Sequence, residues 1–360
     1  MKLRRLINLQ IDIVVGRISG FGGVERVIEE WFQEFSTDSG TNLRIVLPIG
    51  TEDTKWLEAK KKLLNDISTK NKGILFSISL IYAVNYFLKT DSDILVIENY
   101  RLVRIATTIK KIFKKKYQVV SWMHQSLHIK KNMTRWLVDA DAHLAISSGI
   151  KDQLMEVGVP RKKIHIIYNP VEYHVDKVIK APLSEEIKLI YIGRPLLDGQ
   201  KNLRELFSAL KKIQSKKKIK LQMYGVSKYD TDIVNYINEL DISKSVELHG
   251  WAINPWKNID TGTALVLTSK YEGLGMVLIE AISRGLPVIS SNIQVGPKDI
   301  IKDGINGYLY ELGNEEQLVE KIIKLNNERN TYREDVLKNS INCFYKSEYF
   351  ANLKKILSSI

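Results

Sequence analysis

The stretch that decides the fold is "IKLIYIGRPLLDGQKNLRELF", residues 187–207. It consists of a run rich in β-branched residues, a loop with two glycines, and a segment whose apolar residues recur at helical spacing. A second stretch, "IDIVVGRISGFGGVERVIEE" at residues 11–30, has the same plan. We therefore expect two lobes, each of which opens with a strand, a glycine-rich loop and a helix.

The rest of the chain repeats this alternation of strand and helix. Further β-branched runs predict strands at residues 43–47, 93–98, 117–123, 142–147 and 164–168 in the first half, and at 219–225, 245–250, 263–269 and 286–291 in the second. Helical spacing separates most of them, as in "VERVIEEWFQEF". This order predicts an α/β fold of two doubly wound, Rossmann-like lobes with parallel sheets.

The expected joint between the lobes is "VEYHVDKVIKAPLSEE", residues 171–186, where Pro182 lies among polar residues. We predict an N-terminal lobe at 1–178, a C-terminal lobe at 179–345, and a last helix at 346–360 that packs back on the first lobe. Ligands of such sheets bind beyond the carboxyl ends of the strands. The predicted site is therefore the cleft that the two lobes face.

Composition describes a folded protein of two domains. A chain of 360 residues with 44% apolar and 26% charged residues exceeds one ordinary core and is not disordered. Cys343 is the single cysteine, so no internal disulfide can form and a cytoplasmic protein is expected. The apolar segment at 73–88 is short for a membrane span and predicts a buried helix. Asn8 and Asp12 interrupt the N-terminal apolar run, which argues against a signal peptide.

The positive charge lies mainly in the first half. The net charge is +13, and residues 1–180 hold 29 Lys and Arg against 19 Asp and Glu, whereas residues 181–360 hold 25 against 22. An anionic membrane surface, an acidic glycan and nucleic acid are candidate partners. In "RLVRIATTIKKIFKKKYQ", residues 101–118, a helical apolar stripe is flanked by lysines and arginines. Such a helix suits a membrane surface, and equally the surface of an ordinary α/β lobe.

Two glutamates lie eight residues apart in "YEGLGMVLIEAISRGLPVIS", residues 271–290. The glycines between them precede a predicted helix, and backbone N–H groups at a helix N-terminus attract phosphate. Glu272 and Glu280 are strong acceptors for hydroxyl groups. Two hydroxylated rings that flank a diphosphate, as in a sugar nucleotide, would fit this pattern. The alternative is that Glu272 caps the helix and Glu280 forms a salt bridge.

Three further segments carry candidate residues. Arg194 and Lys201 follow a strand, where two cations can neutralise a diphosphate leaving group or simply lie exposed in a turn. The loop "SGFGGVERV", residues 19–27, has three glycines but lacks the G-x-G-x-x-G spacing of dehydrogenases. His124 in "SWMHQSLH" also follows a strand, where it could bond a sugar hydroxyl or be structural. No zinc-like Cys/His spacing and no Walker A loop appear in the sequence.

Together these motifs resemble the retaining glycosyltransferases of family 4, which have the GT-B architecture. Glu272 and Glu280 are similar to the family's E-x₇-E element, and "NGYLY" at 306–310 is similar to its closing N-G-x-L. Within the family, "SWMHQSL", "HLAISSGI", "IYNPVE", "HGWAINPW" and "GPKDII" resemble segments of the lipopolysaccharide 1,6-galactosyltransferases. The resemblance covers nearly the whole chain. It implies metal-independent, retaining transfer of a hexose from a UDP-sugar, with galactose or glucose favoured and no cofactor.

The resemblance also implies residue roles. Arg194 and Lys201 would bind the diphosphate, Glu280 the ribose, and Glu272 and His124 the hexose; these residues except Glu280 form the predicted catalytic set. The predicted donor-binding residues are Gly22, Gly23, Gly193, Arg194, Lys201, Gly225, Trp251, Gly273, Leu274, Gly275, Met276 and Glu280. Leu274 stands where many members of the family have phenylalanine.

The implied acceptor is a saccharide or lipid-linked saccharide of lipopolysaccharide, capsule or another bacterial cell-surface glycan. It would bind on the N-terminal lobe and the donor on the C-terminal lobe, in the cytoplasm or peripherally on the inner face of the membrane. An oxidoreductase is an alternative, but the glycine fingerprint is missing. A basic nucleic-acid-binding protein leaves the glutamate pair unexplained, so nucleic acid is not expected as a partner. A non-catalytic sugar-nucleotide-binding protein would be expected to lose Glu272, Arg194 or Lys201.

Overall fold

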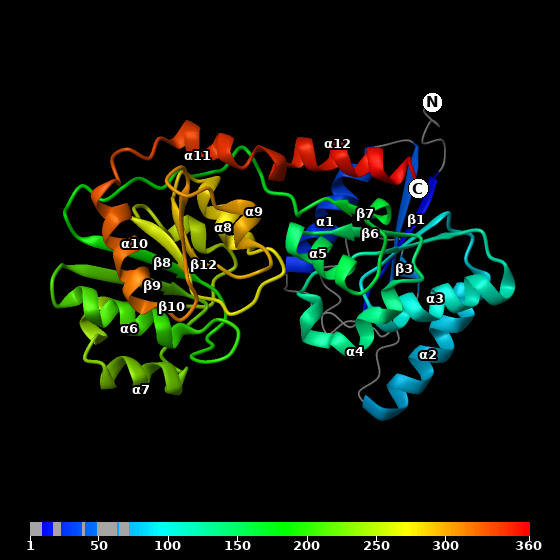
Figure 1. Cartoon of the computed structure of the whole chain (residues 1–360), viewed down its shortest axis with the longest axis horizontal. Coiled ribbons are helices and arrows are strands. Elements are labelled where there is room, and N and C mark those ends of the chain that lie inside the picture. The colour runs from blue at the N-terminus through cyan, green and yellow to red at the C-terminus, as the bar shows by residue number, and fades with distance from the viewer. Residues whose placement is uncertain (1–8, 17–22, 38–39, 49–62, 65–71) are drawn as a thin grey trace. The chain divides into compact units, whose positions relative to one another are not determined.

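The structure is a computed structural model that describes residues 9–16, 23–37, 40–48, 63–64 and 72–360. The chain divides into two compact units (Figure 1). Unit 1 comprises Met1–Pro170 and Tyr349–Ile360, and unit 2 comprises Val171–Glu348. Each unit is built around one parallel sheet. The predicted α/β class and the two doubly wound sheets are confirmed.

Unit 1 alternates strands and helices through most of its length. Its elements are β1 (Leu9–Val14), α1 (Gly23–Ser36), β2 (Thr41–Val46), β3 (Leu63–Leu64), α2 (Lys72–Lys89), β4 (Ile94–Ile97), α3 (Tyr100–Phe113), β5 (Gln118–Ser121), η2 (Leu127–Lys130), α4 (Lys131–Thr134), η3 (Arg135–Leu137), β6 (Ala142–Ala145), α5 (Ser148–Glu156), η4 (Arg161–Lys163) and β7 (Ile164–Ile166). The strand order is β3-β2-β1-β4-β5-β6-β7. Winding therefore reverses between β1 and β4, which pair in parallel with Ile13 opposite Val96.

Helix α12 (Lys346–Leu357) ends the chain, and its residues from Tyr349 onward belong to unit 1. There the Trp31 indole N–H donates to the hydroxyl of Tyr349 over 2.7 Å. Lys354 forms an ion pair of 2.6 Å with Glu34. Trp31 and Tyr349 are both buried, so α1 and α12 share one part of the unit 1 core.

A buried carboxylate lies in the middle of the unit 1 sheet. Asp12 on β1 is fully buried and accepts both Nε and Nη2 of Arg44, at 2.6 and 2.9 Å. The hydroxyls of Tyr86 and Ser92 also donate to it. Burial and the Asp12 charge raise the pKa of Tyr86, so this phenol stays a donor. The network joins β1, β2, α2 and the segment before β4 through one charge.

Unit 2 follows the same plan. Its elements are β8 (Ile187–Ile192), α6 (Leu203–Gln214), β9 (Ile219–Tyr224), α7 (Thr231–Glu239), η5 (Ser243–Ser245), β10 (Val246–Gly250), η6 (Pro255–Asn258), β11 (Ala264–Leu267), α8 (Met276–Ile282), β12 (Val288–Ser291), α9 (Pro297–Ile300), β13 (Gly307–Tyr310), α10 (Glu315–Asn327), α11 (Glu334–Ser340) and η7 (Asn342–Phe344). The strand order is β10-β9-β8-β11-β12-β13, so winding reverses between β8 and β11.

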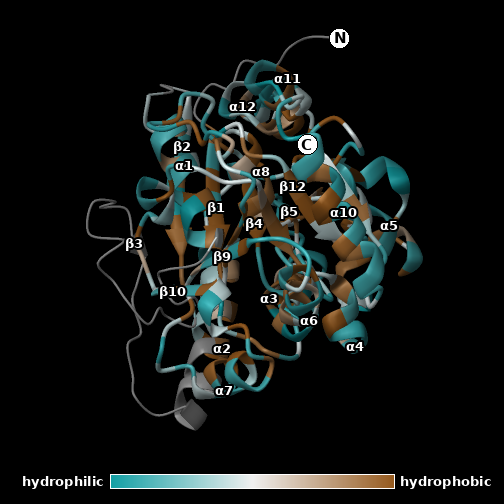
Figure 2. Ribbon diagram, turned by 90° about the vertical axis from the view of Figure 1, so that its left-hand side faces the viewer, coloured by the Kyte–Doolittle hydropathy of each residue, from teal (hydrophilic) through white to brown (hydrophobic). Residues whose placement is uncertain are grey.

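Both faces of the unit 2 sheet are covered by helices. Helices α6, α7 and α10 pack on the face that carries Ala264 and Val266 of β11. Helix α8 also contacts β11, where Leu265 and Leu267 alternate to the other face. All four residues of β11 are buried, as expected for a parallel strand between two helical layers. Figure 2 shows this pattern as brown strands and helices that carry both brown and teal residues.

The eleven predicted strands are all present, and two strands were not predicted. β3 has two residues, and β13 has four and follows a polar turn, so neither gives a usable period. The segment predicted as a buried helix is α2, but Leu80 and Ile81 are 44% and 70% exposed. Over residues 80–89, burial of α2 is thus confined to the face that carries Ala83, Tyr86 and Phe87. Within the described part of the chain, no helix is long and apolar enough to cross a membrane.

Candidate active site

The candidate site of unit 2 lies where the winding of its sheet reverses. After β8 the chain turns toward β9, whereas after β11 it turns toward β12 on the opposite side. The loops that follow these neighbouring strands, residues 193–202 and 268–275, therefore diverge, and open α/β sheets bind ligands at such a point. The sequence places Arg194 and Lys201 on the first loop and Glu272 on the second.

An ion pair of low exposure joins the two loops. The Lys201 ammonium lies 2.6 Å from Glu272 Oε1, and the two side chains are only 12% and 10% exposed. The hydroxyl of Thr268 also donates to the backbone oxygens of Lys201 and Asn202, at 3.0 and 3.1 Å. An ammonium has three N–H donors. Among the described residues, Glu272 is the one hydrogen-bond partner of the Lys201 ammonium. Lys201 is thus positioned with donor capacity to spare.

A second chain of polar contacts runs through Gln200. Arg194 donates to the Gln200 side-chain oxygen, and the Gln200 amide donates to the backbone oxygen of Tyr271 over 3.1 Å. The Lys270 backbone N–H donates to the Gln200 backbone oxygen over 2.8 Å. Arg194 is exposed, unlike Lys201. Its guanidinium is therefore held at the rim of the site while other N–H groups face solvent.

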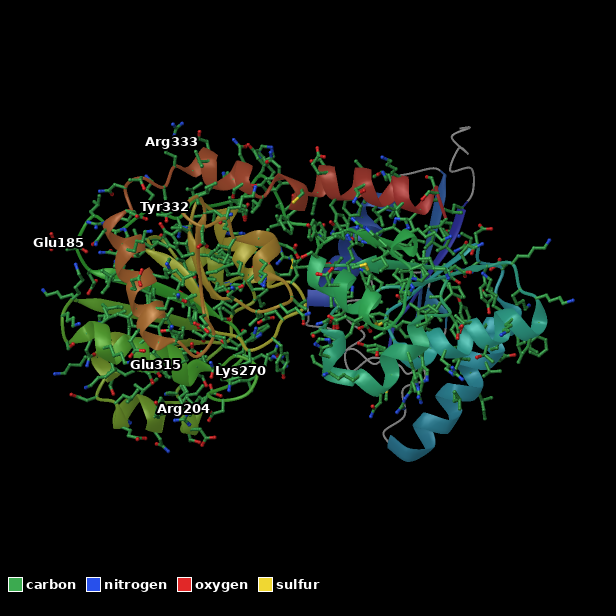
Figure 3. The ribbon with its side chains drawn as sticks, viewed as in Figure 1. Glu185, Arg204, Lys270, Glu315, Tyr332 and Arg333 are labelled. Atoms are coloured by element: carbon green, nitrogen blue, oxygen red, sulfur yellow. The ribbon has the colours of Figure 1, made fainter. Side chains whose placement is uncertain are left out.

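The loop after β8 is also braced from its own helix. Arg204 on α6 donates two hydrogen bonds of 2.9 Å to the Asp198 carboxylate. The same guanidinium lies 4.4 Å from the ring centre of Tyr236 on α7, and Figure 3 labels Arg204 in this part of unit 2. Contacts of this kind at the surface add little stability. Their effect is to fix the course of the loop that carries Arg194 and Lys201.

Two predicted glycines allow close backbone approach. Gly225, after β9, has a φ of +86°, and a Cβ there would lie 2.3 Å from the backbone oxygen of Gly193. A Cβ on Gly193 would lie 2.6 Å from the hydroxyl of Tyr191. That hydroxyl instead donates to the Arg194 backbone oxygen over 2.9 Å. Burial and the Glu272 charge raise the pKa of Tyr191, which keeps it a donor.

Helix α8 begins without a side-chain cap. Gly275 is its N-cap residue, with a φ of +92°. The alternative that Glu272 caps this helix is wrong, because the Glu272 carboxylate binds Lys201. Gly273 and Met276 are partly exposed on either side of this start, and Leu274 is buried.

Glu280 faces an indole. Its Oε2 accepts the Trp256 ring N–H over 2.9 Å, and the Arg284 guanidinium lies 4.9 Å from the Trp256 ring centre. The contact fixes the position of the Glu280 carboxylate on the second turn of α8. Trp251, directly after β10, is 69% exposed and presents an aromatic face at the same edge of the sheet.

His124 belongs to unit 1 and lies after β5. Both ring nitrogens are buried, and no described residue forms a hydrogen bond with them. Its ring packs edge-on against Trp122 at 4.2 Å between centroids. Burial lowers the pKa of His124 to about 3, so the imidazole is neutral at physiological pH and has one donor and one acceptor unused. Native proteins seldom leave buried polar atoms in this state, which makes His124 a ligand-binding candidate.

The remaining predicted residues lie at the start of unit 1. Gly23 is the exposed first residue of α1, and Gly22 lies outside the described residues. Two residues that the sequence reasoning missed are Gln200, which links Arg194 to the second loop, and Trp256, which holds Glu280. Trp256 lies in the segment "HGWAINPW". Its partner on α8 could not be found from spacing, because the contact is tertiary.

Comparison with known proteins identifies the family to which the chain belongs. Residues 21–174 match the model of glycosyltransferase family 4, and residues 175–342 match that of the glycosyl transferases group 1. The lipopolysaccharide 1,6-galactosyltransferase of Salmonella typhimurium is 32% identical over 98% of this chain and 99% of its own length. The Escherichia coli K12 enzyme of the same name is 33% identical over 98% of each chain.

Solved structures agree on the fold. The apo form of the lipopolysaccharide outer core galactosyltransferase WaaB aligns with a TM-score of 0.86 and 31% identity, covering 98% of this chain and 100% of its own. HepE of Anabaena, crystallised with UDP and glucose, aligns with a TM-score of 0.76 at 18% identity, over 97% and 100% of the two chains. The fold and site thus define a glycosyltransferase with the GT-B fold. This chain belongs to glycosyltransferase family 4, and it is similar along its whole length to the lipopolysaccharide 1,6-galactosyltransferases.

Proposed function

We propose that the protein is a retaining hexosyltransferase that moves a hexose from a UDP-sugar to a saccharide of a bacterial cell-surface glycan. The observation that carries the proposal is the ion pair of Lys201 with Glu272, which stands with Arg194 where the winding of the unit 2 sheet reverses. Cations and a hydroxyl acceptor meet there within one small region. A nucleotide diphosphate linked to a sugar needs this combination.

The diphosphate is proposed to bind Arg194 and Lys201. The two cations and Glu272 leave one net positive charge among these three groups, which favours an anionic ligand. Lys201 can donate to a phosphate oxygen while it keeps its bond to Glu272, because an ammonium has three donors. Both cations can then stabilise the negative charge that develops on UDP as it leaves.

The hydroxylated rings of the donor are proposed to bind the glutamates. Glu272 would accept hydrogen bonds from the hexose and Glu280 from the ribose, as the family resemblance implies. Carboxylates make stronger hydrogen bonds to hydroxyls than neutral acceptors do. Trp256 holds the Glu280 carboxylate in place, and His124 of unit 1 is proposed to bond the hexose through one of its unpaired ring nitrogens. The predicted glycines Gly193, Gly225, Gly273 and Gly275 keep the backbone near the donor clear of side chains.

The proposed reaction needs no protein nucleophile. UDP leaves the anomeric carbon while the acceptor hydroxyl approaches from the same face, and a leaving phosphate oxygen takes the acceptor proton. Positioning and charge stabilisation by Arg194 and Lys201 are then the contributions of the protein, without a metal ion. Between the two predicted hexoses, galactose and glucose, the names of the two full-length relatives favour galactose, since both are named galactosyltransferases.

The ribose assignment is tested by replacing Glu280 with glutamine. Glu280→Gln keeps the size of the side chain and an oxygen for Trp256, but loses the charged acceptor. Because hydrogen bonds to charged groups contribute about 1.5–3 kcal/mol, we expect the Kd for UDP to rise about 10- to 100-fold. The measurement is isothermal titration calorimetry with UDP.

A matched control uses the exposed Glu316 on α10, which pairs with Lys212. Glu316→Gln is expected to leave the Kd for UDP unchanged. Equal affinity of the Glu280→Gln variant and the wild type for UDP would remove Glu280 from the donor site.

We also propose that the cytoplasmic protein binds the membrane peripherally through the end of α3. Ile112 and Phe113 are 65% and 57% exposed on its last turn. The adjoining surface cavity of about 730 Å³ is lined by Arg104, Thr107, Thr108, Lys110, Lys111, Ile112, Lys114, Lys115 and Asp139. Exposed apolar side chains beside basic ones suit an anionic lipid surface, where each basic residue contributes about 1 kcal/mol.

Sedimentation with lipid vesicles tests the membrane proposal. Wild-type protein should sediment with phosphatidylglycerol vesicles at low salt and not with phosphatidylcholine vesicles. Replacing Lys111, Lys114 and Lys116 with glutamate should abolish this binding. The matched control replaces the exposed Lys216, Lys217 and Lys218 of unit 2 with glutamate, and should still sediment. Equal sedimentation of wild type with both vesicle types would contradict the proposal.

A further inference from the structure

The unit 1 sheet has its own reversal point, and an acidic side chain stands there. Winding reverses between β1 and β4, whose carboxyl ends are followed by Gly16 and Glu98. The Glu98 backbone N–H donates to the Val14 oxygen over 3.0 Å, which fixes this residue directly at the sheet edge. By the same rule that locates the site of unit 2, this edge is a ligand-binding position.

Four side chains interact electrostatically around this edge, and we name them the Glu98 group. They are Glu98 after β4, Tyr100 on α3, Glu25 on α1 and Lys130 at the end of η2. Glu25 and Tyr100 are 6% and 3% exposed. The ammonium of Lys130 lies 6.0 Å from the Tyr100 ring centre.

One member of the Glu98 group has unused capacity for hydrogen bonds, and another is a carboxylate in an unfavourable setting. The Tyr100 hydroxyl is buried, and it has no hydrogen-bond partner among the described residues. Burial raises the pKa of Glu98 to about 7, against the opposing effects of Lys130 and the Gly16 N–H, and the Glu25 charge raises it further. An ionised carboxylate that burial deprives of water in this way destabilises the folded protein. Costs of this kind are typical of functional sites.

The side-chain types of the Glu98 group select the kind of ligand. A carboxylate accepts hydrogen bonds from hydroxyls, and a phenol both donates and accepts. A ligand with several hydroxyls therefore fits Glu98 and Tyr100.

We infer that Glu98 and Tyr100 bind hydroxyl groups of the acceptor saccharide. The inference rests on the proposed hexosyltransferase function and names the residues that recognise its second substrate. Ionised Glu98 accepts from one or two hydroxyls of the acceptor, and Tyr100 bonds to another. Lys130 supports the ionised form of Glu98. Acceptor affinity therefore increases as the pH rises through 7 and Glu98 loses its proton.

The test measures direct binding of deacylated core oligosaccharide from Escherichia coli lipopolysaccharide, by calorimetry at pH 8. Glu98→Gln should weaken binding about 10- to 100-fold, as expected for the loss of a charged acceptor. Tyr100→Phe should weaken it about 3- to 10-fold, as expected for a neutral hydrogen bond. The Kd for UDP should stay unchanged in both variants. In the wild type, binding should weaken from pH 8 to pH 6, and this dependence should be absent in Glu98→Gln.

Stability separates a binding role from a structural one. Because the folded state raises the pKa of Glu98, the ionised carboxylate costs stability above about pH 7. Glu98→Gln should therefore raise the Tm, and more at pH 8 than at pH 5. The control Glu34→Gln breaks the ion pair with Lys354 at the other end of α1, and should leave oligosaccharide binding unchanged.

Three outcomes would overturn the inference. The first is oligosaccharide binding by Glu98→Gln and Tyr100→Phe that equals the wild type. The second is no oligosaccharide binding by the wild type while UDP binds. The third is a loss of UDP affinity in Glu98→Gln, which would assign Glu98 to the donor. Failure of the proposed function is distinguishable, since the wild type would then bind no uridine nucleotide at all.

Discussion

Replacing Lys201 with methionine is expected to lower kcat by about 10²- to 10³-fold, the usual effect of removing one group that stabilises developing charge. The Lys201 ammonium is held by Glu272 over 2.6 Å and has donors left for a phosphate oxygen. Methionine keeps the length and apolar stem of the side chain but has no charge for the departing UDP. The measurement is steady-state transfer from UDP-hexose.

Two variants make the Lys201 result specific. Lys212 on α6, the helix that follows the Lys201 loop, pairs with Glu315 and Glu316 at 2.7 and 2.6 Å, and Lys212→Met should leave kcat unchanged. Lys201→Arg keeps the charge beside Glu272 and should retain more activity than Lys201→Met. A kcat within about threefold of wild type for a folded Lys201→Met protein would refute the proposed role, since one positioned charge should be worth about 3 kcal/mol.

The largest expected effect on stability comes from Asp12. Asp12→Ala should lower the free energy of unfolding by about 3–5 kcal/mol. The substitution leaves Arg44 without its buried partner, and the hydroxyls of Tyr86 and Ser92 lose their acceptor. A guanidinium stays protonated in proteins even without a partner, so Arg44 cannot relieve the loss by giving up its proton. The measurement is urea unfolding together with calorimetric Tm.

A second carboxylate on the same arginine is the control. Asp91 also lies 2.7 Å from Arg44, but its side chain is 79% exposed. Asp91→Ala should cost less than about 1 kcal/mol, as exposed ion pairs do. Similar losses for the two variants would mean that burial of Asp12 is not what makes its network stabilising.

Most of the fold was predictable because parallel strands buried on both faces are nearly continuous apolar runs. β11 (Ala264–Leu267) and β4 (Ile94–Ile97) are examples, with every residue buried. β13 escaped prediction because "GYLY" is short and begins with glycine. The exposed face of α2 was missed because its sequence is apolar all round, and only the tertiary packing decides which side is covered.

The candidate site was predictable as residues but not as contacts. Strand–loop–helix spacing places Arg194, Lys201 and Glu272 on loops, and the strand order then makes these loops neighbours. The pairing of Lys201 with Glu272 and of Trp256 with Glu280 spans distant parts of the chain, and no local period encodes it. The full set of donor-binding roles, from Gly22 to Glu280, stays a prediction.

Ligand-induced thermal stabilisation of the wild-type protein tests the central claim most directly. The ligands are UDP, GDP, ADP, NAD and a series of UDP-hexoses, each at the same concentration, with nucleic acid tested in parallel. We expect UDP and one UDP-hexose to raise the Tm, because a ligand that binds only the folded state stabilises it. An unchanged Tm with every uridine nucleotide, together with a clear rise with NAD or with nucleic acid, would contradict it.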